Sequence, residues 1–288
     1  MLLTVRPART EDVPVLADLY DRTYRGGYSA SFDRYGPIKP GDFWWVQTEK
    51  ELLLLEVNHK PAGMVIIGRR EGALVAEEVI ADLSAARDEQ TFVQRLGAYL
   101  LQHFRRERAE RLLLRTTEAN PLGLSVARSL DLGFTNLLIV TTFRPRSRHV
   151  VRAPEGYAIR KGTPADVPEL VRIYRECYPV APEPAEVEGL IRRSEVRAWV
   201  AERDKYMVGF LLAEAHAGGF GDLIIGVREA HRRQGLGRAL TTPAMNFFHG
   251  KQLPAVGLSW GLDGLAQAYY RGLGFTTERI YLFFEKSI

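Results

Sequence analysis

The segment Ile224-Ile-Gly-Val-Arg-Glu-Ala-His-Arg-Arg-Gln-Gly-Leu-Gly-Arg-Ala-Leu240 places an apolar run directly before a basic turn with two glycines. The run predicts a buried strand, and the residues after the turn predict a helix. The free N–H groups and positive dipole of a helix N-terminus favour phosphate. Glycines at 235 and 237 allow a ligand close to the backbone. The stretch predicts a pyrophosphate site, although Gly-x-Gly alone also fits an ordinary tight turn.

The two halves of the chain echo one another. Val5-Arg-Pro-Ala-Arg-Thr-Glu-Asp-Val-Pro-Val-Leu-Ala-Asp-Leu-Tyr20 is similar to Ile159-Arg-Lys-Gly-Thr-Pro-Ala-Asp-Val-Pro-Glu-Leu-Val-Arg-Ile-Tyr174, at a constant spacing of 154 residues. Leu132-Gly-Phe134 is repeated at Leu273-Gly-Phe275, at a spacing of 141. The chain therefore contains two copies of one domain. The first copy is longer by 13 residues, which we expect in the loop-like segment 26–42.

The pattern of apolar residues predicts the elements of the second copy. It predicts strands at 197–202, 207–213, 222–227, 254–260 and 279–285, and helices at 235–248 and 264–273. With an opening strand and helix, the order becomes β-α-β-β-β-α-β-α-β, typical of a mixed sheet flanked by helices. We expect Asp12 and Asp166 to help start the first helix of each copy. The predicted domains span 1–143 and 155–288, joined by an Arg/Pro linker at 144–154.

The distribution of charge argues against a nucleic-acid partner. The 288-residue chain has a net charge of +4, but residues 1–145 hold 19 basic and 19 acidic side chains, and residues 155–288 hold 17 and 16. The excess lies in the linker, whereas a nucleic-acid-binding protein concentrates Lys and Arg on one face.

The apolar runs and the cysteine content exclude further classes. The longest apolar runs are far shorter than the roughly 18 residues that span a bilayer, so we expect no membrane span and a cytoplasmic protein. The single cysteine, Cys177, cannot form an intramolecular disulfide or a zinc cluster, and we expect no metal.

A second motif lies downstream of the basic turn. Asp263, Ala266, Tyr270, Gly274 and Phe275 follow the spacing Asn-x-x-Ala-x-x-x-Tyr-x-x-x-Gly-Phe, with aspartate in place of asparagine. Together with Arg232-x-x-Gly235-x-Gly237, this resembles the GNAT superfamily of acyl-CoA N-acyltransferases. The resemblance covers the C-terminal copy, while the N-terminal copy matches in its opening strand and helix, its Gly-Phe and its general layout. It implies an α/β fold of two tandem GNAT-like domains, the first degenerate, each a mixed, mostly antiparallel sheet flanked by helices.

The resemblance also implies where acetyl-CoA binds. The basic turn would hold the pyrophosphate, and the strand ending at Val227 would pair with the pantetheine, helped by a bulge at Gly226. The N–H of Val227 would stabilise the oxyanion. Asp263 fits either a contact to the coenzyme or a helix N-cap. The implied cofactor-binding residues are Ile225, Gly226, Val227, Arg232, Arg233, Gln234, Gly235, Leu236, Gly237, Arg238, Asp263 and Ala266.

The resemblance indicates Tyr270 as the general acid. Its reference pKa of about 10 suits protonation of a departing thiolate, although a buried aromatic on an amphipathic helix also fits. Leu258 stands where some ribosomal-protein acetyltransferases of the family have a glutamate base. The candidate replacements are Glu214, His216, Asp222, Glu229 and a chain of waters, although each of these side chains also fits a solvated charge at a strand end. Glu214 is the expected base because it lies at the end of the preceding strand.

The first copy lacks these groups. Ser129 aligns with Tyr270, and alignment of Leu96-Gly97 with Leu236-Gly237 puts Arg95 at the position of Gly235. We expect the first copy to act as a scaffold or to shape the substrate site, with an altered coenzyme site as the alternative.

The predicted function is acetyl transfer from acetyl-CoA to a primary amine of a small molecule, by a monomer or homodimer. Protein or peptide N-acetylation and a non-catalytic CoA sensor are the alternatives. The carboxylates of Glu176, Glu183, Glu186 and Glu188 would either attract a cationic amine or form a solvated surface.

Overall fold

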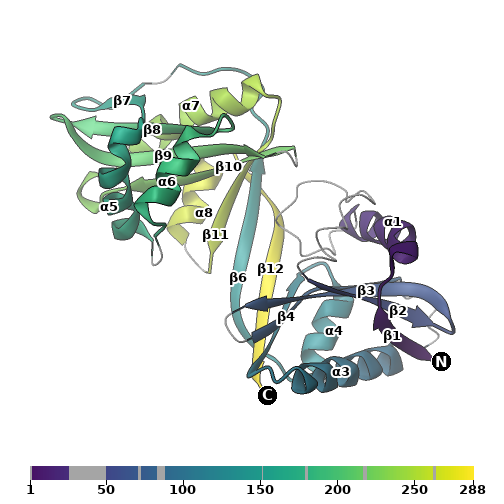
Figure 1. Cartoon of the computed structure of the whole chain (residues 1–288). Helices are drawn as coiled ribbons and strands as arrows, with labels where there is room; N and C mark the ends of the chain where they lie inside the picture. Colours follow the sequence, from purple (N-terminus) through teal and green to yellow (C-terminus); the bar gives the residue numbers. More distant parts are fainter. Residues whose placement is uncertain are drawn as a thin grey trace. The chain divides into compact units, whose positions relative to one another are not determined.

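The computed structural model describes residues 2–25, 50–70, 73–82, 88–150, 152–178, 181–216, 219–261 and 264–288. The expected extra loop at 26–42 lies outside the described residues. The chain divides into two units (Figure 1). Unit 1 comprises Met1–Val140, Trp260–Leu262 and Arg279–Ile288, and unit 2 comprises Thr141–Ser259 and Asp263–Glu278.

Unit 1 is a sheet with helices on both faces. Its elements are β1 (Leu3–Pro7), α1 (Val13–Arg25), β2 (Glu51–Val57), β3 (Lys60–Arg70), β4 (Ala73–Ala81), α3 (Glu89–Arg106), β5 (Arg111–Thr117), α4 (Pro121–Ser129) and parts of β6 (Gly133–Phe143) and β12 (Thr276–Ser287). The strand order is β1-β2-β3-β4-β5-β12-β6, and β4 and β5 pair in parallel. Alternate strand residues pack either against α3 and α4 or against α1, which gives the sheet two apolar faces.

Unit 2 repeats this plan, and its described residues include one helix more than those of unit 1. Its elements are β7 (Ala158–Lys161), α5 (Val167–Cys177), α6 (Pro184–Arg192), β8 (Val196–Arg203), β9 (Tyr206–His216), β10 (Phe220–Val227), α7 (Leu236–Gly250), β11 (Ala255–Trp260) and α8 (Gly264–Gly272). The strand order is β6-β11-β10-β9-β8-β7, and β10 and β11 pair in parallel. The helices α5 and α6 cover one face, and α7 and α8 cover the other (Figure 1).

The repeated Arg and Asp residues perform the same task in both units. Two nitrogens of Arg6 donate to the Asp12 carboxylate at 2.8 and 2.9 Å, and those of Arg160 donate to Asp166 at 2.9 and 2.7 Å. Each aspartate also accepts a hydrogen bond from the backbone N–H three residues earlier, which fixes the turn before α1 or α5. The Arg160 guanidinium lowers the pKa of Asp166 to about 2. The expected role of both aspartates at the helix starts is confirmed.

The last strand departs from the predicted domain boundaries. Boundaries of 1–143 and 155–288 assign β12 to the second copy, whereas Arg279–Ile288 belong to unit 1. Tyr281 to Ser287 pair with Thr117 to Arg111 of β5 in antiparallel register. In the same way, Thr141 at the end of β6 belongs to unit 2, where its hydroxyl donates to the Gly257 carbonyl at 3.0 Å. The reason is that each closing strand is long enough to take part in both units.

The predicted fold class is confirmed. Every strand and helix predicted for the second copy is present, with ends that shift by a few residues. The helix α6 was not predicted, because three glutamates and two prolines make Pro182–Glu188 resemble a loop. Among the described residues, no helix combines the length and apolarity needed to cross a bilayer.

Candidate functional site

The two parallel strands of unit 2 separate after a short contact. Only Gly221 and Asp222 of β10 pair with β11, opposite Ala255 and Val256. Beyond Asp222, β10 remains paired with β9 in continuous register through Gly226. The expected bulge at Gly226 is therefore wrong, because the opening arises where β10 and β11 diverge. We call this gap the strand opening.

The backbone of β10 offers hydrogen-bonding groups to the strand opening. The N–H of Arg228 donates to the Val208 carbonyl of β9, at 2.9 Å. Because alternate residues of a strand direct their N–H groups to opposite sides, those of Ile225 and Val227 point away from β9 and toward the opening. The carbonyls of Ile225 and Val227 on this edge already accept hydrogen bonds, from the Tyr178 hydroxyl at 2.8 Å and from Nε of Arg232 at 2.8 Å. An extended chain would therefore pair with this edge through the two N–H groups.

A cleft of about 380 Å³ lies where the strand opening meets the start of α7. The N-cap of α7 is Gly235, whose φ of +84° is a conformation that strongly favours glycine. Gly235 has no side chain to cap this helix, and the first turn of α7 contains no acidic residue. The first N–H groups of α7 are thus left for a ligand.

Eight of the twelve predicted cofactor-binding residues line this cleft: Ile225, Val227, Arg232, Arg233, Gly235, Leu236, Gly237 and Arg238. Three others do not line it. A Cβ on Gly226 would point toward Phe210 and Cys177. Gln234 accepts a hydrogen bond from the Tyr157 hydroxyl at 2.6 Å, and Ala266 packs against the core of unit 2. Asp263 lies outside the described residues.

The wall of the cleft opposite α7 was not predicted. It is formed by Leu265, Ala268, Tyr269, Gly272 and Leu273 of α8 and the following turn. Their spacing of three and four residues marks one face of a helix, which is the signal that would have identified them.

The ring of Tyr269 explains the need for glycine at 237. A Cβ on Gly237 would lie 2.8 Å from this ring, so its role is close packing rather than direct approach of a ligand. The Tyr269 hydroxyl donates to the Gly237 carbonyl at 3.1 Å and also bonds to the Thr241 hydroxyl. Burial raises the pKa of Tyr269. These bonds fix the first turn of α7 against α8.

Tyr270 is buried, with 5% of its surface exposed, and it does not line the cleft. Its ring packs against Gly257 of β11, where a Cβ would lie 2.4 Å from the ring. Burial raises the pKa of the phenol, while a hydrogen bond with the backbone of Leu258 acts in the opposite direction. In a parallel pair, every second residue turns its backbone N–H toward the neighbouring strand, so the N–H of Leu258, like that of Val256, points toward β10. The phenol oxygen therefore lies at the inner end of the strand opening, as a neutral group at pH 7.

The candidate bases fall into one group and one outlier. Glu214, His216 and Asp222 come together: one carboxylate oxygen or imidazole nitrogen of each lies within 4.8 Å of those of the other two. Glu229 belongs to the short 3-10 helix Glu229–His231 in the turn before α7. The Glu214 carboxylate, which was the expected base, accepts from Arg193 at 2.6 Å.

Two of the four candidate amine-attracting glutamates around α5 and α6 form ion pairs with arginine. Glu176 pairs with Arg228 at 2.5 Å, and Glu188 pairs with Arg192 at 2.5 Å. Glu186 accepts from the backbone N–H of Glu183 at the start of α6. Of the two expectations for these carboxylates, a solvated and paired surface fits better than an amine-attracting patch.

The corresponding helix start in unit 1 is unsuited to phosphate. The side chain of Asp88 caps α3 by accepting from the N–H of Thr91 at 3.0 Å, and Glu89 occupies the first turn. The alignment of Leu96-Gly97 with Leu236-Gly237 is wrong, because both residues are buried in the middle of α3. A nearby cavity includes Glu89 and Ser129, the residue that aligns with Tyr270.

Unit 1 retains a strand opening, but its own side chain fills it. Pairing between β4 and β5 ends at Ala76 and Leu114. Beyond that point, the buried amide of Asn120 donates to the Val79 carbonyl at 2.9 Å. The edge of β4 is therefore already hydrogen-bonded at this point.

Comparisons with known proteins agree with this geometry. Residues 194–277 match the family model described as Acetyltransferase (GNAT) domain. No curated protein matches the sequence. Among the solved structures that resemble the whole chain are three GNAT proteins. A GCN5-related N-acetyltransferase from Sphaerobacter thermophilus has a TM-score of 0.73 at 15% identity, covering 99% of this chain and 95% of that one.

The other two are also full-length matches. A tandem GNAT protein from the clavulanic acid biosynthesis pathway has a TM-score of 0.70 at 13% identity, covering 99% of this chain and 98% of that one. A GNAT-family acetyltransferase from Colwellia psychrerythraea has a TM-score of 0.60 at 12% identity, covering 99% of both chains. The cleft thus lies within the residues, 194–277, that match the GNAT acetyltransferase domain, and the whole chain has the fold of the tandem GNAT structures.

Proposed function

We propose that unit 2 transfers an acetyl group from acetyl-CoA to a primary amine of a small molecule, with Tyr270 as general acid. The observation that supports this most is the continuity of three features. The start of α7, the N–H groups that β10 turns toward the strand opening and the phenol of Tyr270 follow one another from the cleft to the inner end of the strand opening.

The residues of the cleft fit acetyl-CoA. Arg232, Arg233 and Arg238 bring positive charge to a helix start that holds no carboxylate, which suits a diphosphate. The N–H groups of Ile225 and Val227 can pair with the amides of a pantetheine chain. When bound, acetyl-CoA supplies an acyl group activated as a thioester.

The chain's own groups would then direct the transfer. An N–H of β10 stabilises the oxyanion that forms when the amine attacks the thioester carbon. The new C–N bond forms, the C–S bond breaks, and its electron pair leaves with sulfur. Tyr270 gives its proton to that sulfur and regains one from the nitrogen of the new amide. The ammonium form of the amine must lose a further proton before attack, so a base is also required.

Unit 1 serves as a scaffold in this proposal. The capped start of α3 and the Asn120 amide in its strand opening support that role. The balanced charge of both halves supports a small-molecule acceptor over nucleic acid. The single cysteine supports a cytoplasmic location, and we propose a monomer or homodimer.

The test is release of free thiol from acetyl-CoA in the presence of a panel of small primary amines. We expect release that depends on one class of amine and gives the N-acetylated product by mass spectrometry. Thiol release with peptides or protein N-termini, and with none of the small amines, would mean that the acceptor is a protein or peptide. Coenzyme binding without release for any amine would indicate a sensor instead.

A separate prediction concerns the helix start. Gly235→Ala forces a side chain into a left-handed backbone conformation that costs about 1 kcal/mol or more, and it moves the first N–H groups of α7. We expect a tenfold or greater loss of acetyl-CoA affinity, measured by calorimetry.

Gly156→Ala is the matched control. Gly156 has a φ of +78°, with no atom near its open side, and it does not line the cleft. The Gly156→Ala variant should lose about as much stability as Gly235→Ala but keep the acetyl-CoA affinity of the wild type. Equal losses of affinity in the two variants would show that backbone strain, not the cleft, decides binding.

A further inference from the structure

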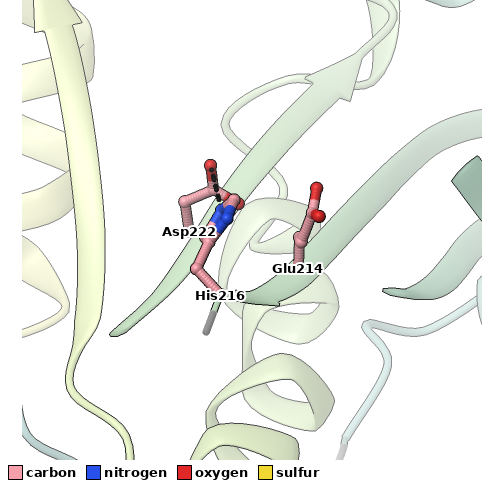
Figure 2. A group of neighbouring side chains, drawn as sticks. All are labelled: Glu214, His216 and Asp222. Carbon is pink, nitrogen blue, oxygen red and sulfur yellow. Dashed lines mark ion pairs between the residues drawn. The ribbon is translucent and has the colours of Figure 1, made fainter. Parts of the chain in front are cut away.

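Three polar side chains lie together at the end of the β9–β10 hairpin (Figure 2). Nε2 of His216 lies 3.1 Å from Oδ2 of Asp222. Phe220 stacks on the imidazole with its ring centre 4.5 Å away. Glu214 stands opposite Asp222 in the strand register. The imidazole is therefore held between an aromatic ring and a carboxylate.

The strand register places this group at the inner end of the strand opening. Asp222 is the last residue of β10 that pairs with β11, so the two strands part immediately beyond it. The charge of Asp222 also acts on Tyr270, whose pKa it helps to raise. A substrate at the end of the strand opening would thus lie near both the phenol and the His216–Asp222 pair.

Glu214, His216 and Asp222 lie on the sheet face that α5 and α6 cover. Alternation along β10 puts Asp222 on the same side as Ile224, which packs with α5 and α6. The cleft at the start of α7 instead includes Ile225 and Val227, from the opposite side of the strand. Acetyl-CoA and an amine could therefore reach the strand opening from different faces.

The charges around His216 make it a stronger base than a free imidazole. The interaction with the Asp222 carboxylate raises its pKa most, the charge of Glu214 raises it further, and burial and Arg193 lower it. The Glu214 carboxylate is bound to Arg193, which reduces its capacity to take a proton. Nε2 of His216 faces Asp222 and is buried, whereas the side chain as a whole is 31% exposed, so Nδ1 is the nitrogen that would take up a proton and pass it to water.

We propose that His216, positioned by Asp222, is the base that removes the ammonium proton of the acceptor. This rests on the proposed acetyl transfer and assigns its missing proton acceptor, in place of Glu214. The neutral imidazole takes one proton from the ammonium group, which leaves an amine with a free electron pair. The resulting imidazolium then releases that proton to water. Tyr270 gives its own proton to the leaving sulfur and regains one from the nitrogen of the new amide.

The test compares His216→Gln, Asp222→Asn and Glu214→Gln in the full-length chain, with His249→Gln near the end of α7 as the control. Acetyl-CoA affinity should stay within about twofold in each variant. We expect kcat/KM of the wild type to rise with pH through the pKa of His216, because only the neutral imidazole accepts a proton. That rise should vanish in His216→Gln and move to lower pH in Asp222→Asn, where the group that raises the pKa is lost. Glu214→Gln should change it little, and His249→Gln should not change it.

A second readout uses the acceptor itself. His216→Gln should reduce kcat/KM by about 100-fold for an amine that is an ammonium ion at pH 7, and far less for one that is already neutral. An unchanged pH profile in His216→Gln, or equal losses for both amines, would overturn the proposal while leaving acetyl transfer intact. Activity lost on addition of a chelator would also overturn it, because the three side chains would then hold a cation. If the wild type transfers no acetyl group at all, both proposals fail together.

Discussion

Tyr270→Phe should lower kcat by at least about 100-fold, because the leaving thiolate loses its proton donor. The ring remains, so its packing against Gly257 and its 5.2 Å contact with Phe275 are retained. Acetyl-CoA affinity should stay within about twofold, since the ring does not line the cleft. Steady-state kinetics and calorimetry on the same preparation would measure the two effects separately.

The neighbouring tyrosine gives the sharpest comparison. Tyr269→Phe removes the hydroxyl that bonds to the Gly237 carbonyl and the Thr241 hydroxyl. We expect it to weaken acetyl-CoA binding through the first turn of α7, with a smaller effect on kcat. Tyr281→Phe, at a buried tyrosine of unit 1, should change neither quantity. A large loss of kcat in Tyr269→Phe and none in Tyr270→Phe would mean that Tyr269, and not Tyr270, is the general acid.

Removal of Arg279–Ile288 should unfold unit 1, although these residues come last in the chain. They form the strand beside β5, and seven of them pair with it. The Arg111–Glu285 ion pair at 3.1 Å and the bond from the Ile280 N–H to Glu118 at 2.8 Å would be lost with them. A domain is stable by only about 5–15 kcal/mol, so loss of an internal strand exceeds what unit 1 can tolerate.

Hydrogen exchange would measure this effect. In the truncated chain, amides of β4 and β5 should lose protection, while those of β8 and β9 in unit 2 keep theirs. Deletion of Ser287 and Ile288 alone is the control, because most of the β5 pairing remains. Full protection of β4 and β5 in the truncated chain would mean that the last strand is dispensable to unit 1.

Local signals in the sequence predicted most of the fold and much of the cleft. The 3.6-residue and two-residue periodicities gave the elements of unit 2, and the glycines and arginines at 232–238 located the start of α7. These features depend on neighbours within one or two turns, so a single sequence is enough to reveal them.

The features that were not predicted depend on contacts between distant residues. The place of β12 follows from its pairing with β5, which lies more than 160 residues away. The meeting of His216 and Asp222 depends on the register of one hairpin. Gly97 aligned with Gly237 in the sequence, but a Cβ there would lie 2.9 Å from the Ser129 hydroxyl, so Gly97 serves the packing of α3 on α4.

The most direct measurement is a crystal structure of the protein with acetyl-CoA. We expect one molecule per chain, with its diphosphate against the N–H groups at residues 235–238 and its sulfur next to the Tyr270 hydroxyl. A diphosphate bound at the start of α3, or a start of α7 left empty at saturating acetyl-CoA, would contradict it.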